Sequence, residues 1–322
     1  MARRRFDALA VGDAILDIVT PPLPPSMAGD RQLRVERFSY LPGGNATNFA
    51  LSFAALGGRT GFVGSIGRDW AGDVLRSAYR AGRVDARLHV SPAKATGTTL
   101  AMTFADGTRH LITALGANAD LRSSHVPVSW VAGARHVHRA GYWWATGLIG
   151  APTAKLLARA HAAGATTSLD VATDPEGWPP HRTEAVRSVL RHVDIFFGNE
   201  EEVLRLAGGS PLEAAAEVLL NLGAREVVVH QGDRGATLFT RTGVTSAGAF
   251  PVVPVNPTGC GDIFNAAYVR ASLAGADGDG RLRFANAAAA WHLENIRRPY
   301  PSRRDIRARF SVSLPAGPRS RR

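Results

Sequence analysis

Between about residue 135 and residue 293, short apolar runs alternate with segments of helical periodicity, and this alternation constrains the fold more than any other feature of the sequence. Strict alternation of strand and helix is typical of a parallel sheet covered by helices on both faces. Ligands of such folds bind beyond the carboxyl ends of the strands. The pattern predicts strands at 137–140, 166–171, 193–197 and 226–230, and helices at 152–163, 183–191, 200–207, 212–222, 261–274 and 282–293.

The part of the chain before residue 135 adds further elements to this α/β fold. Apolar runs and glycine punctuation predict strands at 6–11 and 60–63 and helices at 45–56 and 69–81. The runs 98–104 and 110–113 flank Asp106 and Gly107, an Asp-Gly pair typical of a β-hairpin turn. We expect residues 15–38 and 96–113 to form a lid on a single domain spanning 1–310. Residues 311–322 have the composition of a disordered basic tail.

The net charge of +11 resides at the two ends of the chain. Arg3, Arg4 and Arg5 and the nine arginines between 297 and 322 account for the excess, so that the body is neutral. We therefore expect solvated ends and no nucleic-acid partner. No apolar run approaches the roughly 20 residues needed to cross a bilayer. The single cysteine, Cys260, excludes an intramolecular disulfide, and we predict a cytoplasmic protein.

The segment 256–265 (NPTGCGDIFN) carries the most chemical information. It follows the apolar run 250–255 and precedes a helical run, so that Gly259 and Gly261 can turn backbone N–H groups toward one point at the positive end of a helix. Such a point binds anions. Asp262 beside it is suited to take a proton from an attacking hydroxyl. An ordinary acidic residue in the first turn of a helix explains Asp262 equally well from the residues alone.

This segment closely resembles the second signature of the ribokinase-like (PfkB) carbohydrate kinases. The first signature is matched by 43–48 (GGNATN), followed by Gly58 and by Gly67, Asp69 and Gly72. Asn199 and Glu202 match the Asn-x-x-Glu element of the family, and Gly232 and Gly235 match its nucleotide-loop glycines. The resemblance covers about 6–308, and the chain is identified as a member of this family.

The resemblance implies a three-layer sandwich with a mostly parallel central sheet and a small β lid. It also implies ATP-dependent phosphoryl transfer to a hydroxyl, with Asp262 as catalytic base and Gly259, Cys260 and Gly261 in the anion hole. Substrate hydroxyls would bind at Asp13, Asp17, Gly43, Gly44 and Asn48. The nucleotide would bind at Asn199, Gly232, Gly235 and Asn286. Asn199 and Glu202 would orient Mg²⁺ through water.

Several of these residues have simpler explanations. Asp13, Asp17, Asn48 and the glycines are also turn formers, and Asn286 fits a helix surface. For Cys260, a role in filling space at the start of the helix explains the residue better than a role as a nucleophile.

Three functions fit the sequence. A neutral monosaccharide resembling ribose or fructose is the first choice of substrate, because carboxylate and amide side chains suit vicinal hydroxyls. A nucleoside kinase is the alternative, with Phe104, Trp143 and Trp144 available to stack on a base. A catalytically silent sugar-binding or regulatory protein is the third candidate, against which the intact Asp262 argues.

Potassium-dependent members of the family carry an Asp six residues before the catalytic base, where this chain has Asn256. A neutral amide in place of a carboxylate weakens a hard-cation site. We therefore expect K⁺ activation to be weak or absent. We also consider a homodimer formed through the lid.

Overall fold

The computed structural model describes residues 4–24, 32–105, 108–209, 211–255 and 257–315. Within them the chain forms a nine-stranded sheet in the order β13-β12-β11-β10-β9-β8-β1-β4-β5 and a separate four-stranded sheet. The seven strands in the sequence β11-β10-β9-β8-β1-β4-β5 run parallel to one another, whereas β12 is antiparallel to both β11 and β13. The predicted mostly parallel sheet is thus confirmed. Its strands are β1 (Phe6–Val11), β4 (Thr60–Ile66), β5 (Asp85–Val90), β8 (Ala134–Arg139), β9 (Thr166–Asp170), β10 (Ile195–Asn199), β11 (Glu226–His230), β12 (Ala236–Thr240) and β13 (Gly243–Ala247).

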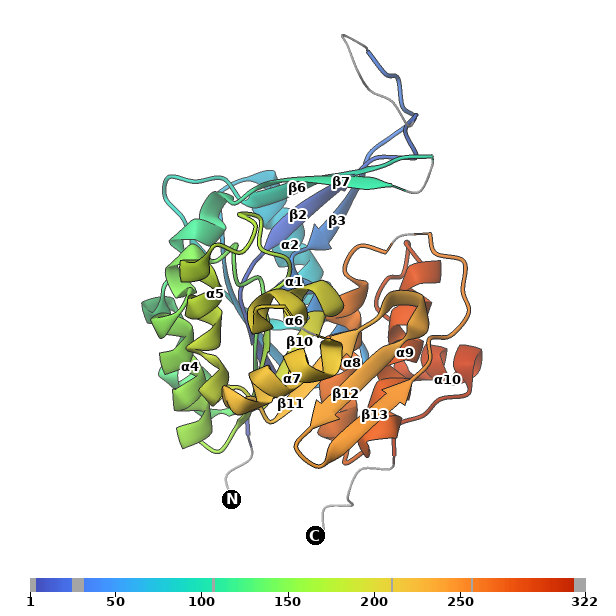
Figure 1. Ribbon diagram of the computed structural model, residues 1–322. Coiled ribbons are helices and arrows are strands. Elements are labelled where there is room, and N and C mark those ends of the chain that lie inside the picture. Colours follow the sequence, from blue (N-terminus) through green and yellow to red (C-terminus); the bar gives the residue numbers. More distant parts are fainter. Residues whose placement is uncertain (1–3, 25–31, 106–107, 210, 256, 316–322) are drawn as a thin grey trace, which may run out of the picture.

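Helices cover both faces of this sheet and make the three layers visible in Figure 1. In β1, Leu9 and Val11 point into one apolar core and Ala8 and Ala10 into the other, as the period of a strand requires. The first core also receives α3 (Val128–Ala132), α4 (Ala151–Ala162), α5 (Pro180–Arg187), α6 (Glu200–Ala207) and α7 (Leu212–Asn221). The second receives α1 (Asn45–Ala55), α2 (Trp70–Ala81), α8 (Cys260–Ser272), α9 (Gly278–Glu294) and α10 (Arg303–Phe310).

The smaller sheet is the lid, drawn at the top of Figure 1. Its order is β3-β2-β6-β7, with β2 (Ile15–Val19) in parallel register with β6 (Gly97–Thr103) and antiparallel to β3 (Ser39–Gly43). The fourth strand, β7 (Arg109–Ala114), pairs with β6 as the predicted hairpin. The Asp106 and Gly107 turn lies outside the described residues. The predicted lid ended at residue 38 and therefore missed β3, because its sequence SYLPG lacks the alternation of a strand.

Two other predictions from the sequence need correction. The helix expected at 183–191 begins at Pro180 and ends at Arg187, because proline is well accommodated in the first turn of a helix. Within the disordered tail expected at 311–322, Val312 and Leu314 pack against the second core. The apolar run 250–255 forms no strand, and Val253 and Val255 are exposed. Residues 316–322 lie outside the described part of the chain.

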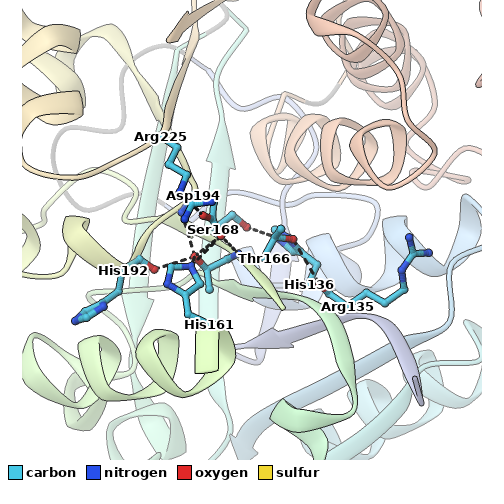
Figure 2. Close-up of polar contacts among 9 residues, drawn as sticks. Arg135, His136, His161, Thr166, Ser168, His192, Asp194 and Arg225 are labelled. Carbon is cyan, nitrogen blue, oxygen red and sulfur yellow. Dashed lines mark hydrogen bonds and ion pairs between the residues drawn. The ribbon is translucent and has the colours of Figure 1, made fainter. Parts of the chain in front are cut away.

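A polar cluster lies along β8 and β9 and at Asp194, just before β10 (Figure 2). The carboxylate of Asp194 accepts a hydrogen bond from the backbone N–H of Thr167, 2.8 Å away. It also contacts the imidazole ring of His161 and the guanidinium group of Arg225. The ring of His136 bonds the hydroxyls of Thr166 and Ser168. Burial lowers the pKa of His136 to about 3, so its ring is neutral. This cluster joins neighbouring strands and has no direct part in the site described next.

No helix in the described residues is long and apolar enough to cross a membrane.

Candidate active site

The N-terminal ends of α1 and α8 meet at the carboxylate of Asp262. Asp262 lies in the first turn of α8 and is only 3% exposed. Its two oxygens accept hydrogen bonds from Asn45 Nδ2 and Asn48 Nδ2, each at 3.0 Å. Burial, together with the negative charge of Asp170, raises the pKa of Asp262 well above its ordinary value. A carboxylate with a raised pKa is a stronger proton acceptor.

The loop before Asp262 has the conformation that an anion hole requires. Gly259 is the N-cap of α8 and has a φ of 83°, a left-handed value that glycine adopts readily. A Cβ atom at this position would lie 2.8 Å from Asn48 Nδ2. The first turn of a helix leaves its backbone N–H groups without partners inside the helix. The turn at 259–262 therefore places backbone N–H groups next to the Asp262 carboxylate, and the N–H of Cys260 also donates to the Pro257 carbonyl at 3.3 Å.

One cavity, of about 260 Å³, lies on the Asp262 side of this loop. The residues in its wall come from the turn after β1, the lid, the start of α1, the turn after β8 and the loop itself, and none of them is cationic. Trp144 is the aromatic residue of the wall. The wall consists of Asp13, Ile15, Asp17, Gly44, Asn45, Asn48, Thr99, Leu111, Thr113, Trp144, Pro257, Thr258, Gly259 and Asp262.

The two predicted substrate carboxylates differ in what holds them. Asp13 accepts from the backbone N–H groups of Asn45 and Ala46 at the start of α1, so part of its role is structural. Asp17 lies on lid strand β2, and no donor from the described residues reaches its carboxylate. Burial and the charge of Asp13 raise the pKa of Asp17 to about 7. Gly43 is needed beside it, since a Cβ there would lie 2.1 Å from Asp17 Oδ2.

A second cavity, of about 570 Å³, lies on the other side of the same loop. Three of the four predicted nucleotide residues, Gly232, Gly235 and Asn286, line it, whereas Asn199 does not. Cys260 and Gly261 of the anion-hole turn also line it. Phe250, Pro251, Val252 and Pro254, from the run without strand structure, form an apolar wall. Asn286 is buried rather than on a helix surface, and its amide donates to the carbonyl oxygens of Ala247 and Gly248.

Asn199 and Glu202 form a capping box at the start of α6. Asn199 Oδ1 accepts from the Glu202 N–H at 2.9 Å, and Glu202 Oε2 accepts from the Asn199 N–H at 2.9 Å. The other oxygen of Glu202 accepts from Thr173 Oγ1. Burial and the charge of Glu202 raise the pKa of nearby Asp170 to about 7. Two buried carboxyls that repel each other in this way suit a divalent cation, whose charge would relieve the repulsion.

Some residues of the site were missed by the sequence reasoning. Tyr300, from the loop after α9, donates its hydroxyl to Asn48 Oδ1 at 3.0 Å and so orients the amide that faces Asp262. Arg139, fully buried at the end of β8, attracts the Asp13 carboxylate electrostatically. Asn45, which donates to Asp262, was also missed, although it lies within the first signature at 43–48 and could have been found there. Tyr300 and Arg139 belong to neither signature, and only the folding of the chain brings them to the site.

The aromatic residues suggested for a nucleoside base do not gather at the site. Trp143 is 2% exposed, packs edge-on against Tyr142 and Trp178, and donates to the Ala172 carbonyl. Phe104 is buried against His110. Neither residue lines the cavity that contains Asp262, so Trp144 alone of the three suggested residues is available to stack on a substrate.

Comparisons with known proteins identify the family of this chain. Residues 6–297 match the model of the pfkB family of carbohydrate kinases. A nucleoside kinase from Methanothermobacter thermautotrophicus is 29% identical over 292 residues, covering 90% of each chain, and fructokinase-1 from Oryza sativa is 29% identical over 283 residues, covering 84% of each. The structure of a putative ribokinase II from E. coli in complex with ATP and Mg²⁺ is similar with a TM-score of 0.80 at 25% identity, covering 94% of this chain and 98% of that one.

The fold is that of the ribokinase-like kinases. The chain belongs to the pfkB family of carbohydrate kinases and is an ATP-dependent kinase.

Proposed function

We propose that this enzyme transfers the γ-phosphoryl group of ATP to a hydroxyl of a small neutral sugar resembling ribose or fructose, with Asp262 as the catalytic base. The arrangement of two cavities around one loop carries the proposal. Pro257 borders both cavities, Gly259 and Asp262 face the smaller one, and Cys260 and Gly261 face the larger one. A sugar hydroxyl in the first and a nucleotide in the second would meet at the anion-hole turn.

The chemistry follows from the groups at that turn. Asp262 accepts the proton of the attacking sugar hydroxyl. The oxygen of that hydroxyl forms a bond to the γ-phosphorus of ATP, while the bond between the γ-phosphorus and the β-phosphate oxygen breaks and ADP leaves. The N–H groups of 259–262 stabilise the charge of the transferring group. General-base assistance typically supplies about 10² to 10⁴-fold in rate. Positioning and electrostatic stabilisation must therefore supply the rest of the acceleration.

The composition of the smaller cavity supports a neutral substrate. Asp13, Asp17 and Asp262 all line it, and carboxylates disfavour an anionic substrate such as a sugar phosphate. Carboxylate, amide and threonine side chains together suit vicinal hydroxyls. A nucleoside is the second candidate, favoured by Trp144 in the wall and by the similarity to the archaeal nucleoside kinase.

An ATP-consumption screen over pentoses, hexoses and nucleosides tests the proposal. We expect the highest kcat/KM for a neutral monosaccharide. A clear preference for nucleosides would transfer the function to the second candidate. Tight sugar binding without any phosphorylation in the whole panel would instead indicate the catalytically silent sugar-binding protein.

We further propose that Mg²⁺ bound with ATP is held through its water molecules by Asn199 and Glu202. Mg²⁺ prefers oxygen ligands and keeps several water molecules. The neighbouring carboxyl groups of Asp170 and Glu202 would supply the negative charge that balances the ion. When bound, the ion would neutralise charge on the phosphate oxygens.

Glu202→Gln tests this placement with little disturbance of α6, because a glutamine also completes a capping box. We expect the Mg²⁺ concentration for half-maximal rate to rise about tenfold, because the contact between the Glu202 carboxylate and the water molecules bound to Mg²⁺ loses its charge. The KM for the sugar should change little. Titration of the initial rate with Mg²⁺ at saturating ATP is the measurement, and a superimposable titration for the variant would contradict the assignment.

The sugar affinity should depend on pH through Asp17. Its pKa of about 7 means that the hydrogen-bond-accepting carboxylate predominates above that pH and is lost below it. We therefore expect the KM for the sugar to rise as the pH falls from about 8 to about 6, approaching tenfold as the ionised fraction drops.

Asp17→Asn should abolish this pH dependence and weaken sugar binding by about 10 to 100-fold at alkaline pH, the usual value of a hydrogen bond to a charged group. The KM for ATP, measured in the same series, is the control and should stay constant. A variant that keeps the wild-type pH slope would show that another group titrates.

For monovalent cations we propose weak or absent activation by K⁺. The support is the sequence, in which Asn256 supplies no carboxylate, although Asn256 itself lies outside the described residues. The measurement is kcat/KM with and without about 100 mM KCl, balanced with choline chloride to hold the ionic strength. A rise above about tenfold, or about 1.4 kcal/mol, would refute the expectation.

We also propose that the enzyme is cytoplasmic and binds no nucleic acid.

We further propose that the enzyme is a homodimer joined through the lid. On the lid face opposite to Asp17, the neighbouring residues Tyr40, Ile18, Leu100 and Ile112 form an apolar row across all the strands. Tyr40 is 49% and Ile112 is 59% exposed, so a second lid would bury them. Light scattering in solution measures the oligomeric state.

A further inference from the structure

His292 lies in the last turn of α9 and is 5% exposed. Its Nε2 atom lies 2.7 Å from the carbonyl oxygen of Thr258, and its Nδ1 atom lies 2.9 Å from the carbonyl oxygen of Pro299. A backbone carbonyl carries no hydrogen and can only accept, so each ring nitrogen must donate. In a neutral ring one nitrogen would instead direct its lone pair at a carbonyl oxygen. Both contacts can be hydrogen bonds only if the ring is the doubly protonated imidazolium.

The position of the ring in α9 also favours a positive charge. The C-terminal end of a helix carries partial negative charge, and cations in the last turn are stabilised there. The two carbonyl dipoles add to this effect at close range. A buried charge is costly unless its hydrogen-bonding capacity is satisfied. Both N–H groups of this imidazolium are satisfied, one by each carbonyl.

Both contacts of His292 lead to the site of phosphoryl transfer. Thr258 lines the smaller cavity and immediately precedes Gly259, the N-cap of α8. Pro299 immediately precedes Tyr300, whose hydroxyl orients the Asn48 amide that donates to Asp262. A further bond, from the Val255 N–H to the Leu293 carbonyl at 2.7 Å, joins the same loop to the same helix end.

We propose that His292 is a positively charged positioning residue that fixes the anion-hole loop and places a positive charge behind it. The proposal rests on the proposed function, because it assigns a role within the same anion hole.

The protonation state can be measured without any assay of activity. In protein labelled with ¹⁵N-histidine, the side-chain nitrogen shifts distinguish an imidazolium, with both nitrogens protonated, from a neutral ring. The signals of His292 are those that disappear in His292→Gln. We expect an imidazolium at slightly alkaline pH, where an exposed histidine is neutral. A neutral His292 would overturn the proposal.

His136 is the internal control in the same spectrum. It is also buried with both ring nitrogens bonded, but its partners are the hydroxyls of Thr166 and Ser168, which can donate as well as accept. Its ring should therefore be neutral, in keeping with its pKa of about 3.

Cation rescue tests the role of the charge. His292→Ala leaves two carbonyl oxygens facing the vacated space, and hard monovalent cations bind such oxygens. We expect kcat to fall about 10 to 100-fold, as for a disturbed anion hole, with KM for the sugar changed less than about threefold because its hydrogen-bonding groups remain. K⁺ should then restore at least part of kcat, whereas choline at equal ionic strength should not.

His136→Ala should lose thermal stability without any response of its kcat to K⁺, because the His136 ring bonds Thr166 and Ser168 of β9 and not the anion-hole loop. A response of His292→Ala no greater than that of wild type would contradict the proposed role. If the wild-type enzyme phosphorylates nothing in the substrate panel, the proposed function fails, yet the ¹⁵N spectrum still decides the charge of His292. If His292→Ala does not fold, the spectrum of the wild type decides alone.

Discussion

Asp262→Asn is expected to lower kcat by at least about 100-fold, because the amide cannot accept the proton of the attacking hydroxyl. ATP binding should remain within about threefold of wild type, since the larger cavity that would hold the nucleotide does not include Asp262. Single-turnover kinetics with saturating sugar, combined with titration calorimetry of ATP, separate the two effects. Turnover close to that of wild type would remove Asp262 from the mechanism.

The stability of this variant provides the control for misfolding. Burial and the charge of Asp170 raise the pKa of Asp262, so that the ionised carboxylate destabilises the folded state once the pH exceeds the pKa of the unfolded chain. Replacing it with a neutral amide removes that cost, but the new NH₂ group faces one of the two amide donors, Asn45 Nδ2 or Asn48 Nδ2, which loses its acceptor. Because the two effects oppose each other, we expect Asp262→Asn to have a Tm at neutral pH close to that of wild type, while its kcat falls. A lowered Tm would attribute the lost activity to misfolding instead.

Gly259→Ala is the second substitution expected to have a large effect, a loss of about 10² to 10³-fold in kcat, comparable with removal of an oxyanion-hole donor. The residue has a left-handed φ of 83°, and the new Cβ would lie 2.8 Å from Asn48 Nδ2. Relief of this clash moves either the N–H groups of the turn or the amide that donates to Asp262. Both displacements misplace groups that must fit the transition state.

Gly208→Ala is the matched control for the backbone strain. Gly208 caps α6 with a φ of 90°, and a Cβ there would meet no atom within 4 Å. The strain should cost about 1 kcal/mol in both variants, as for any residue with a Cβ in this conformation. Only Gly259→Ala should lose activity. Equal losses of kcat in the two variants, measured at saturating ATP and sugar, would mean that general destabilisation explains the result.

The sequence was most informative where function and local structure use the same residues. The glycines around Asp262 and the motif 43–48 are close together in the chain, and each must adopt its local conformation whatever the rest of the fold does. The parallel sheet was predictable because its buried strands are apolar runs separated by helices. Strand β3 and the hairpin β12-β13 were not predicted, since their stability comes from pairing with neighbouring strands rather than from their own sequence pattern.

The motif Asn199-x-x-Glu202 shows how one pattern can serve two purposes. The structure uses both side chains to cap α6, and the proposed contact with hydrated Mg²⁺ adds to that role. Likewise, the sequence offered Phe104, Trp143 and Trp144 as equal candidates for a stacking surface. Tertiary packing directed Trp143 and Phe104 away from the cavity, because large aromatic side chains gain most when they are fully buried.

The sequence by itself determined the α/β class, the order of the two signatures and the position of the candidate base, because these depend on local residue patterns. The tertiary structure alone decided the environment of that base. Burial and Asp170 raise its pKa, Tyr300 orients its partner Asn48, and His292 joins the anion-hole loop to α9. These residues are far from Asp262 in the chain or separated from it by a full helix. Their effects depend on distance and desolvation in space, which no spacing along a sequence encodes.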